Sequence, residues 1–244
     1  EVRFYVYPDE VGEAAENNAK VVGMIETFAP LFGEYPFITE KYGHAQFPWG
    51  GGMEHQTCTS LGGWWESVIA HELAHQWWGM QTIGAGVEGE FFICETLAQH
   101  SALTVLRGEY SDAVLADYMK TKTDLYLRGR AREESAEKPL ARTNFETSYV
   151  HYDKGLVVMS ALREVMSERA LDAAVRAFFE AAARRSAPFP IAEDFIRELV
   201  KAAPDGARET VREMVEEIVL YDNRAVSAEA EEDGGGKYRV TLRF

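Results

Sequence analysis

The sequence predicts an α+β fold, in which a small mixed sheet with its helices is followed by a mainly helical lobe. Strand-like segments fall early in the chain, at 2–7, 42–49 and 53–60, whereas residues 64–220 carry apolar stripes at helical spacing. A length of 244 residues is enough for two lobes with substantial cores.

Three regions follow from these patterns. We expect a mixed α/β lobe at 1–108, a helical lobe at 109–221, and at 222–244 the start of a β segment that is cut short. In the last region, AEAEEDGGG predicts a charged turn and KYRVTLRF predicts a strand. The chain opens without Met in the middle of a strand, so we expect it to be a piece of a longer protein.

The first lobe is expected to begin with a strand at 2–7 and one amphipathic helix at 12–32, whose apolar stripe turns inward. An extended segment at 42–49 follows, and three glycines separate it from a strand at 53–60. His44 lies in the extended segment, and we assign it no role.

The nine residues 71–79 read HELAHQWWG. Residues four apart share one face of a helix, so His71 and His75 can aim both imidazoles at a single point, and imidazole is a good zinc ligand. Glu72 lies about 100° further round the helix, close enough to act on a metal-bound water without being a ligand. This is the geometry that a hydrolytic zinc site needs.

The helix around this motif is predicted to be buried. The run WWESVIAHELAHQWW at 64–78 is apolar nearly all round, and Gly79 follows at a C-cap position. Two histidines and a glutamate in such a helix are costly unless a partner satisfies them, and a metal would do so. The alternative is a chance HExxH on a surface helix.

A third ligand must come from elsewhere, because catalytic zinc takes three protein ligands and leaves one position for water. The next helix, FFICETLAQHSALTVLRG at 91–108, places Glu95 as the lone carboxylate on its apolar face. We therefore predict Glu95 as the third ligand. His100 falls on the polar side of this helix, and we expect it to be exposed.

The remainder is predicted to be helical, apart from one long polar loop at 128–147. Tyr152 stands at the entrance of a predicted helix, Tyr149 is expected to pack, and His151 is expected in a loop. The predicted helices span 111–127, 153–166, 170–185, 191–203 and 207–220.

Four ordered motifs resemble the zinc aminopeptidase family of aminopeptidase N and leukotriene hydrolase: GGME, HELAHQWWG, a glutamate opening the next helix, and YDKG at 152–155. The resemblance spans residues 42–221, is closest in wording to bacterial, membrane-associated members, and implies a thermolysin-like catalytic domain with one Zn²⁺. The roles it implies are zinc binding by His71, His75 and Glu95, general-base catalysis by Glu72, oxyanion stabilisation by Tyr152, binding of the substrate α-amine by Glu54, and substrate contact by Gly51, Gly52 and Met53.

The glycines would let a substrate backbone approach and pair with the sheet edge, so that Glu54 sits where the first residue of a peptide ends. His55 stands where the family has asparagine, and we interpret it as supporting the strand. Family members also carry a β-rich domain before the catalytic one, which in some supplies a further acid to the amine site. We therefore expect weaker amine binding here.

The spacing of the third ligand departs from the family pattern. The family has eighteen residues between the second histidine and the glutamate, whereas here nineteen residues separate His75 from Glu95. The eighteen-residue position is Cys94, whose thiolate is a competing ligand. We favour Glu95, because the glycine-rich loop at 80–89 can absorb one inserted residue and because Ala98 and Ala102 share the face of Glu95.

Composition excludes other classes. A net charge of −15 argues against nucleic-acid binding and is compatible with an acidic cleft that attracts an ammonium group. No apolar run approaches a membrane span. Two cysteines, Cys58 and Cys94, are too few to indicate a compartment, so both a cytoplasmic and a membrane-associated parent stay open, as does the oligomeric state.

These observations lead to one main hypothesis and two alternatives. The main hypothesis is a zinc aminopeptidase that cleaves peptides with a free N-terminus by attack of a metal-activated water. A thermolysin-like endopeptidase would use the same chemistry without an amine anchor. A peptide-binding scaffold with a vestigial zinc site would bind peptides without cutting them.

Overall fold

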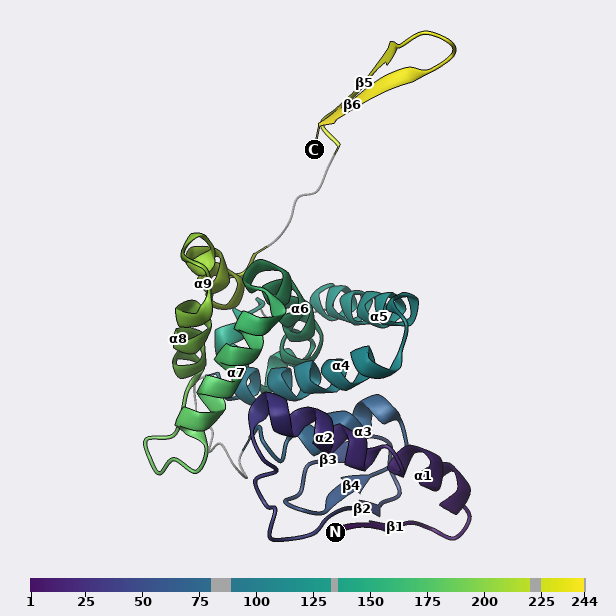
Figure 1. Ribbon diagram of the computed structural model, residues 1–244, viewed down its shortest axis with the longest axis vertical. Coiled ribbons are helices and arrows are strands. Elements are labelled where there is room, and N and C mark those ends of the chain that lie inside the picture. The colour runs from purple at the N-terminus through teal and green to yellow at the C-terminus, as the bar shows by residue number, and fades with distance from the viewer. Residues whose placement is uncertain (80–88, 133–135, 220–224, 244) are drawn as a thin grey trace.

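The computed structural model describes residues 1–79, 89–132, 136–219 and 225–243. Among these residues, four strands form a mixed sheet in the order β1-β2-β4-β3 (Figure 1). β1 (Val2–Tyr5), β2 (Tyr42–Gln46) and β4 (Thr59–Leu61) run parallel, and β3 (Gly52–Met53) pairs antiparallel with β4. This mixed sheet and the mainly helical remainder confirm the predicted α+β class.

Two helices, α1 (Val11–Asn18) and α2 (Val21–Phe32), replace the single helix predicted at 12–32. The chain breaks at Lys20, whose N–H donates to a carbonyl three residues back. Beside the break, the buried Asn18 places its Oδ1 2.7 Å from Nδ1 of His44 on β2. The prediction of a single helix at 12–32 was wrong because it followed the apolar stripe alone. The buried His44 pairs with Asn18, a polar residue that this stripe does not include.

The strand predicted at 53–60 is also interrupted. β3 ends at Met53, and the chain turns back before β4, so that Gly52 pairs with Leu61. In this turn Thr57 adopts a positive φ of 58°, and its N–H donates to Oε1 of Gln76 at 2.9 Å. The turn therefore attaches the edge of the sheet to the end of the HExxH segment.

α3 (Glu66–Ala74) carries the first part of that segment and packs against α2, β3 and β4 on one side and α4 on the other. Its residues Ile69 and Leu73 are fully buried, and so are Trp77 and Trp78 beyond its end. Trp65, which the apolar pattern included, is 57% exposed. The helix is thus buried on most of its circumference rather than all round.

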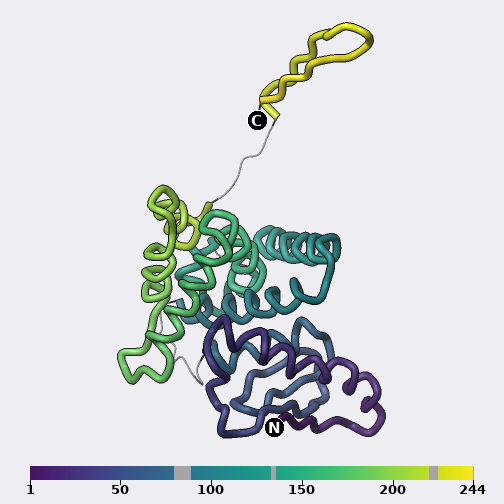
Figure 2. Tube along the Cα trace, in the orientation of Figure 1, coloured from purple at the N-terminus to yellow at the C-terminus, as the bar shows by residue number. Residues whose placement is uncertain are grey.

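The helical lobe follows the sheet lobe along the chain, and α4 lies at their junction (Figures 1 and 2). Short 3₁₀ turns at Leu140–Arg142 and Phe145–Thr147 interrupt the predicted polar loop. The α-helices are α4 (Leu97–Glu109), α5 (Asp112–Arg130), α6 (Gly155–Met166), α7 (Glu168–Ala182), α8 (Ala192–Ala202) and α9 (Arg208–Glu216).

A hairpin of β5 (Ser227–Glu232) and β6 (Tyr238–Arg243) ends the described chain. β6 matches the predicted strand, but the acidic run that we expected to be a turn forms β5, since its backbone pairs along the whole of β6. The boundary predicted at 221/222 lies outside the described residues. None of the described helices combines the length and apolarity needed to cross a membrane.

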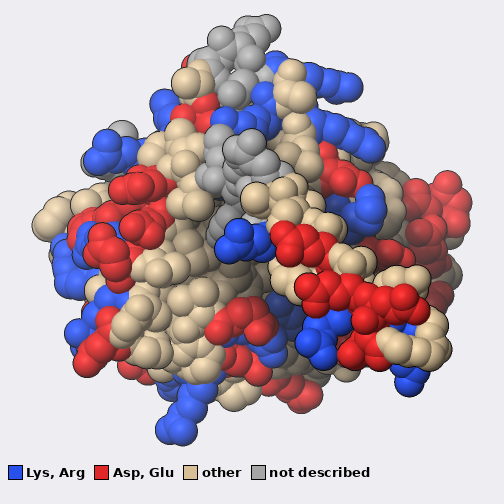
Figure 3. Space-filling model, turned by 90° about the horizontal axis from the view of Figure 1, so that it is seen from above, with Lys and Arg blue, Asp and Glu red and all other residues tan. Residues whose placement is uncertain are grey.

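Charged side chains of both signs are interspersed on the face seen in Figure 3. Many form exposed pairs one helical turn apart, such as Lys120 with Asp124 at 2.7 Å and Arg176 with Glu180 at 2.8 Å. The net negative charge is therefore spread over solvated helix faces as well as over the cleft.

Candidate active site

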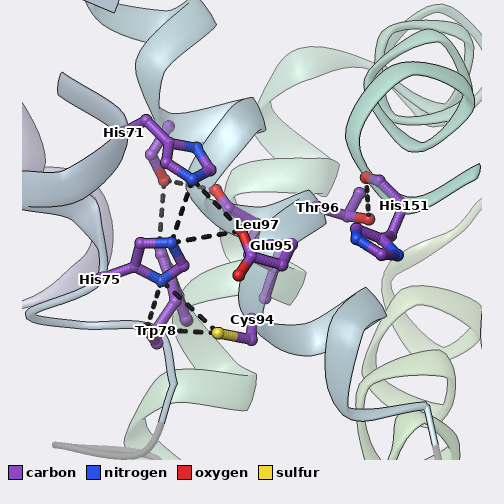
Figure 4. Close-up of polar contacts among 9 residues, drawn as sticks. His71, His75, Trp78, Cys94, Glu95, Thr96, Leu97 and His151 are labelled. Carbon is purple, nitrogen blue, oxygen red and sulfur yellow. Dashed lines mark hydrogen bonds and ion pairs between the residues drawn. The ribbon is translucent and has the colours of Figure 1, made fainter. Parts of the chain in front are cut away.

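His71 and His75 lie on one face of the last turns of α3 and its extension. The N–H of His75 still donates to the carbonyl of His71, which keeps the helical spacing of the two residues. The two residues are 7% and 1% exposed, and their Nε2 atoms lie 3.1 Å apart. The two imidazoles thus converge as predicted (Figure 4).

The orientation of His75 is set by its other nitrogen. Nδ1 lies 3.0 Å from the carbonyl oxygen of Trp78, which only an N–H can satisfy. This hydrogen bond leaves a lone pair on Nε2, the arrangement of a histidine that ligates a metal through Nε2. The turn after α3 therefore fixes the tautomer of the second histidine.

Glu95 approaches both imidazoles from a second element, the π-helical turn η1 (Phe92–Thr96). Its Oε2 lies 3.2 Å from Nε2 of His71 and 3.4 Å from Nε2 of His75. Burial alone would raise the pKa of Glu95, but the neighbouring His75 and His71 hold it well below its usual value. Glu95 therefore stays ionised, which is the form in which a carboxylate binds a metal.

These three groups fit a tetrahedral zinc ion. Zinc bonds of about 2.0–2.2 Å to nitrogen and oxygen separate neighbouring ligand atoms by about 3.3–3.5 Å. The observed separations of 3.1, 3.2 and 3.4 Å are close to these values. The buried Oε2 of Glu95 faces the Nε2 atoms of both histidines, and a cation between these three acceptors would satisfy all of them.

Cys94 lies on the opposite side of the His75 ring from this point. Its Sγ is 3.5 Å from Nδ1, not Nε2, and 3.9 Å from the Trp78 carbonyl. The loop that we expected to absorb the additional residue lies outside the described residues at 80–88. The π-turn η1 offers a second place for it, because a π-turn holds one residue more than an α-turn, and here it presents Glu95 to the imidazoles.

Glu72 and Glu54 lie next to the convergent imidazoles. One oxygen of each, together with a nitrogen of His75, forms a group whose atoms are all within 4.8 Å of one another. Glu72 is 6% exposed, and burial, aided by the charge of Glu54, raises its pKa to about 7. Gly52 covers Glu72 so closely that an added Cβ would lie 2.4 Å from its carboxylate.

Tyr152 belongs to a second π-helical turn, η4 (Val150–Lys154), which precedes α6. Its ring centroid is 5.9 Å from that of His71. Burial, with the nearby carboxylate of Glu95, raises the pKa of its phenol, so the hydroxyl stays protonated. The sequence placed Tyr152 at a helix entrance, and the structure places it in a π-turn that faces the site.

The two π-turns contact each other directly. The buried Oγ1 of Thr96 donates to the carbonyl of His151 at 2.7 Å. Gly155 packs so closely on Thr96 that an added Cβ would lie 2.5 Å from Oγ1. Glu95 and Tyr152 are therefore each adjacent to a residue in this contact.

Two histidine predictions were wrong. His100 is 3% exposed because α4 is covered by α5 and α6 as well as by α3, and burial lowers its pKa to about 3. His151 is buried in η4, stacks on Phe91 at 4.8 Å and lies 3.2 Å from Oγ1 of Thr143. Polarity within one helix or loop cannot reveal cover supplied by another element.

Other predicted residues take supporting positions. Nδ1 of the exposed His55 lies 3.1 Å from the hydroxyl of Ser60 and so supports the turn between β3 and β4. Tyr149 stacks on Tyr126 with ring centroids 6.2 Å apart, in the packing role expected of it. Met53 is 41% exposed at the edge of the sheet.

A pocket of ≈ 320 Å³ opens beside the site. Its lining includes Gly51, Gly52, His71, Glu72, Tyr152 and, from α5, Tyr118 and Lys122. Lys122 carries no signal in the sequence, because no local pattern distinguishes it from Lys120 on the same helix. A buried cluster missed in the same way joins Glu137 to Lys154 and Arg130.

The sequence matches the description "Peptidase family M1 domain" over residues 53–218, which is more than half of the chain. A search of curated proteins found no match. Among solved structures, the fold resembles the M1 zinc metallopeptidase from Deinococcus radiodurans, with 22% identity and a TM-score of 0.66 over 83% of this chain and 44% of the other. It also resembles yeast leukotriene A4 hydrolase, with 17% identity and a TM-score of 0.73 over 91% and 39%.

This chain thus spans less than half the length of the structures that it resembles. Because the sequence identities are low, these two structures show a likeness of fold alone. That fold agrees with the thermolysin-like catalytic domain expected from the motifs. The family match covers the HExxH segment, Glu95 and Tyr152 together. The chain therefore belongs to peptidase family M1, a family of zinc-dependent peptidases.

Proposed function

We propose that this domain is a zinc aminopeptidase, which removes residues from the free N-terminus of a peptide. The observation that carries the proposal is the carboxylate of Glu54, within 4.8 Å of the side-chain atoms of Glu72 and His75. An ammonium group paired with Glu54 would lie close to the hydrolytic centre. An endopeptidase with the same zinc chemistry has no use for an acid at this place.

The chemistry is divided among the residues of the site. His71, His75 and Glu95 hold the metal, which supplies a Lewis acid for the scissile carbonyl and the attacking water. Glu72 takes the proton of the water and passes it to the leaving amine, two steps that suit a carboxyl whose pKa is about 7. Tyr152 donates a hydrogen bond from its hydroxyl to the developing oxyanion and keeps its proton.

Structures of other family members support a peptide as the substrate. A variant of the Deinococcus radiodurans metallopeptidase was solved with a Tyr-Ser-Ala substrate, and yeast leukotriene A4 hydrolase was solved with bestatin. We extend the class of ligand in the first of these, a short peptide, to this chain. The preferred first side chain is left to experiment.

The test is hydrolysis of aminoacyl-aminocoumarin substrates and their N-acetylated forms by zinc-loaded and chelator-treated protein. We expect activity that requires both zinc and a free amine. Glu54→Ala should reduce the preference for the free amine by about 10-fold or more, because it removes a charge-assisted pair. Glu40→Gln, an exposed acid in the same lobe, serves as the matched control.

Glu72→Gln should retain zinc and lose turnover by about 100-fold or more. Cleavage of internally quenched, N-blocked peptides would instead indicate an endopeptidase. Stoichiometric binding of zinc and peptide without turnover would indicate a scaffold. Either of these results would refute the proposed function.

A further inference from the structure

The site has an acidic residue, Glu54, on one side and a pocket on the other. If the proposed function holds, this difference fixes the direction in which a peptide binds. Glu54 belongs to the His75 side, because one of its oxygens lies within 4.8 Å of a nitrogen of His75 and an oxygen of Glu72. The pocket of ≈ 320 Å³ belongs to the other side, where His71, Glu72 and Tyr152 line it and neither Glu54 nor His75 does. A peptide with its amine at Glu54 therefore extends past Glu72, so that the residue after the scissile bond enters this pocket.

Lys122 supplies the positive charge in the lining of the pocket. Among the described residues that line it, Lys122 is the one lysine or arginine, and Glu72 is the one acid. The lysine side chain is only 15% exposed, although no residue of its helix α5 is fully buried. A cation that is partly removed from water interacts more strongly with an anion than a surface lysine does.

The ammonium of Lys122 is held in place but not saturated. Its Nζ donates to Oδ1 of Asp153 at 3.2 Å and lies 5.8 Å from the ring centroid of Tyr118. An ammonium has three protons, and among the described residues Asp153 accepts one of them, so the others can serve a ligand. Asp153 follows Tyr152 directly in η4, which ties the position of Lys122 to the catalytic tyrosine.

We infer that Lys122 binds a carboxylate of the substrate on the C-terminal side of the scissile bond. This makes Lys122 a specificity-determining residue for peptides that carry an anion in this position. The anion is either the C-terminal carboxylate of a dipeptide or the side chain of an acidic second residue. Both present the same group to the pocket, and the experiment separates them.

The test compares kcat/KM for Leu-Ala with Leu-Ala amide, and for Leu-Glu amide with Leu-Gln amide, by measuring released leucine. In the wild type, one carboxylate substrate should exceed its neutral partner by about 10-fold, as expected for a hydrogen bond between charged groups. A preference in the first pair identifies the C-terminal carboxylate, and a preference in the second pair identifies the side chain. Equal values in both pairs would overturn the inference.

Variants test whether Lys122 causes the preference for a carboxylate substrate over its neutral partner. Lys122→Met should reduce the ratio to about 1, Lys122→Arg should retain most of it, and Lys120→Met, whose parent side chain is 71% exposed on the same helix, should leave it unchanged. A ratio that survives in Lys122→Met refutes the role of the lysine. If Lys122→Met does not fold, Lys122→Gln takes its place.

A second measurement distinguishes failure of the proposed function from failure of the inference about Lys122. If none of the four peptides is cleaved, the aminopeptidase assignment falls, and Lys122 is judged by calorimetric dissociation constants of the same peptides on zinc-loaded Glu72→Gln protein. Tighter binding of one carboxylate peptide that disappears when Lys122→Met is added supports the inference. Equal binding of all four peptides overturns it.

Discussion

Gly52 should be essential for turnover although it carries no side chain. It lies on β3, directly above the carboxylate of Glu72. A Cβ at this position would lie 2.4 Å from Cγ and Oε1 of Glu72 and 2.5 Å from Cδ. The three nearest atoms all belong to Glu72, so Gly52→Ala is a perturbation aimed at the proposed general base.

The magnitude follows from this contact. Ordinary van der Waals contact begins at 3.4 Å, so the carboxylate must move by about 1 Å. A misplacement of about 1 Å at a catalytic group costs about 100-fold in rate, or about 2.7 kcal/mol in the barrier. The cost in stability should be small, because the displaced atoms are the end of a flexible side chain.

The assay is the turnover of an aminoacyl-aminocoumarin at saturating concentration, with zinc content and thermal unfolding measured on the same sample. Gly52→Ala should lose about 100-fold in kcat and retain zinc. Gly50→Ala is the matched control, since none of the described atoms that it could meet lies within 4 Å of its added Cβ. Near wild-type kcat in a folded, zinc-loaded Gly52→Ala protein would refute the placement of Glu72.

Three further predictions concern the metal, the oxyanion and pH. Glu95→Gln should bind zinc more weakly than Cys94→Ala by about 10-fold or more, measured by competition with a chelator, and the reverse order would exchange their roles. Tyr152→Phe should lower kcat about 100-fold with little change in KM, and an unchanged kcat would contradict the oxyanion role. Burial lowers the pKa of His44 and His100 to about 3, so each contributes stability that is complete above about pH 6.5 and lost as pH falls towards 3. In zinc-free protein, His100→Gln should reduce the slope of urea stability against pH by about 1.4 kcal/mol per unit between pH 6 and 4, and an unchanged slope would refute this.

The convergence of the site was predictable because it depends on spacing within single helices. Four-residue spacing brings His71 and His75 together whatever packs around them. Glu95 was chosen as the lone carboxylate on an apolar face, and its oxygen lies beside both imidazoles. The roles of these residues stay predictions until the variants are measured.

What the sequence did not predict depends on contacts between distant segments. The break before α2 lies beside the pairing of Asn18 with His44, 26 residues away. The burial of His100 comes from neighbouring helices, and the partial burial of Lys122 comes with its contact to Asp153, 31 residues later. The turn after β3 depends on Gln76, which holds the N–H of Thr57. Local periodicity contains no information on such partners.

The contact between the two π-turns has a mechanical consequence. Thr96 and His151 are joined by a buried hydrogen bond, and Gly155 leaves no room for a gap between their helices. Glu95 and Tyr152 are therefore positioned through a single contact between their two turns, so a substitution at Thr96 or Gly155 should displace both of them together.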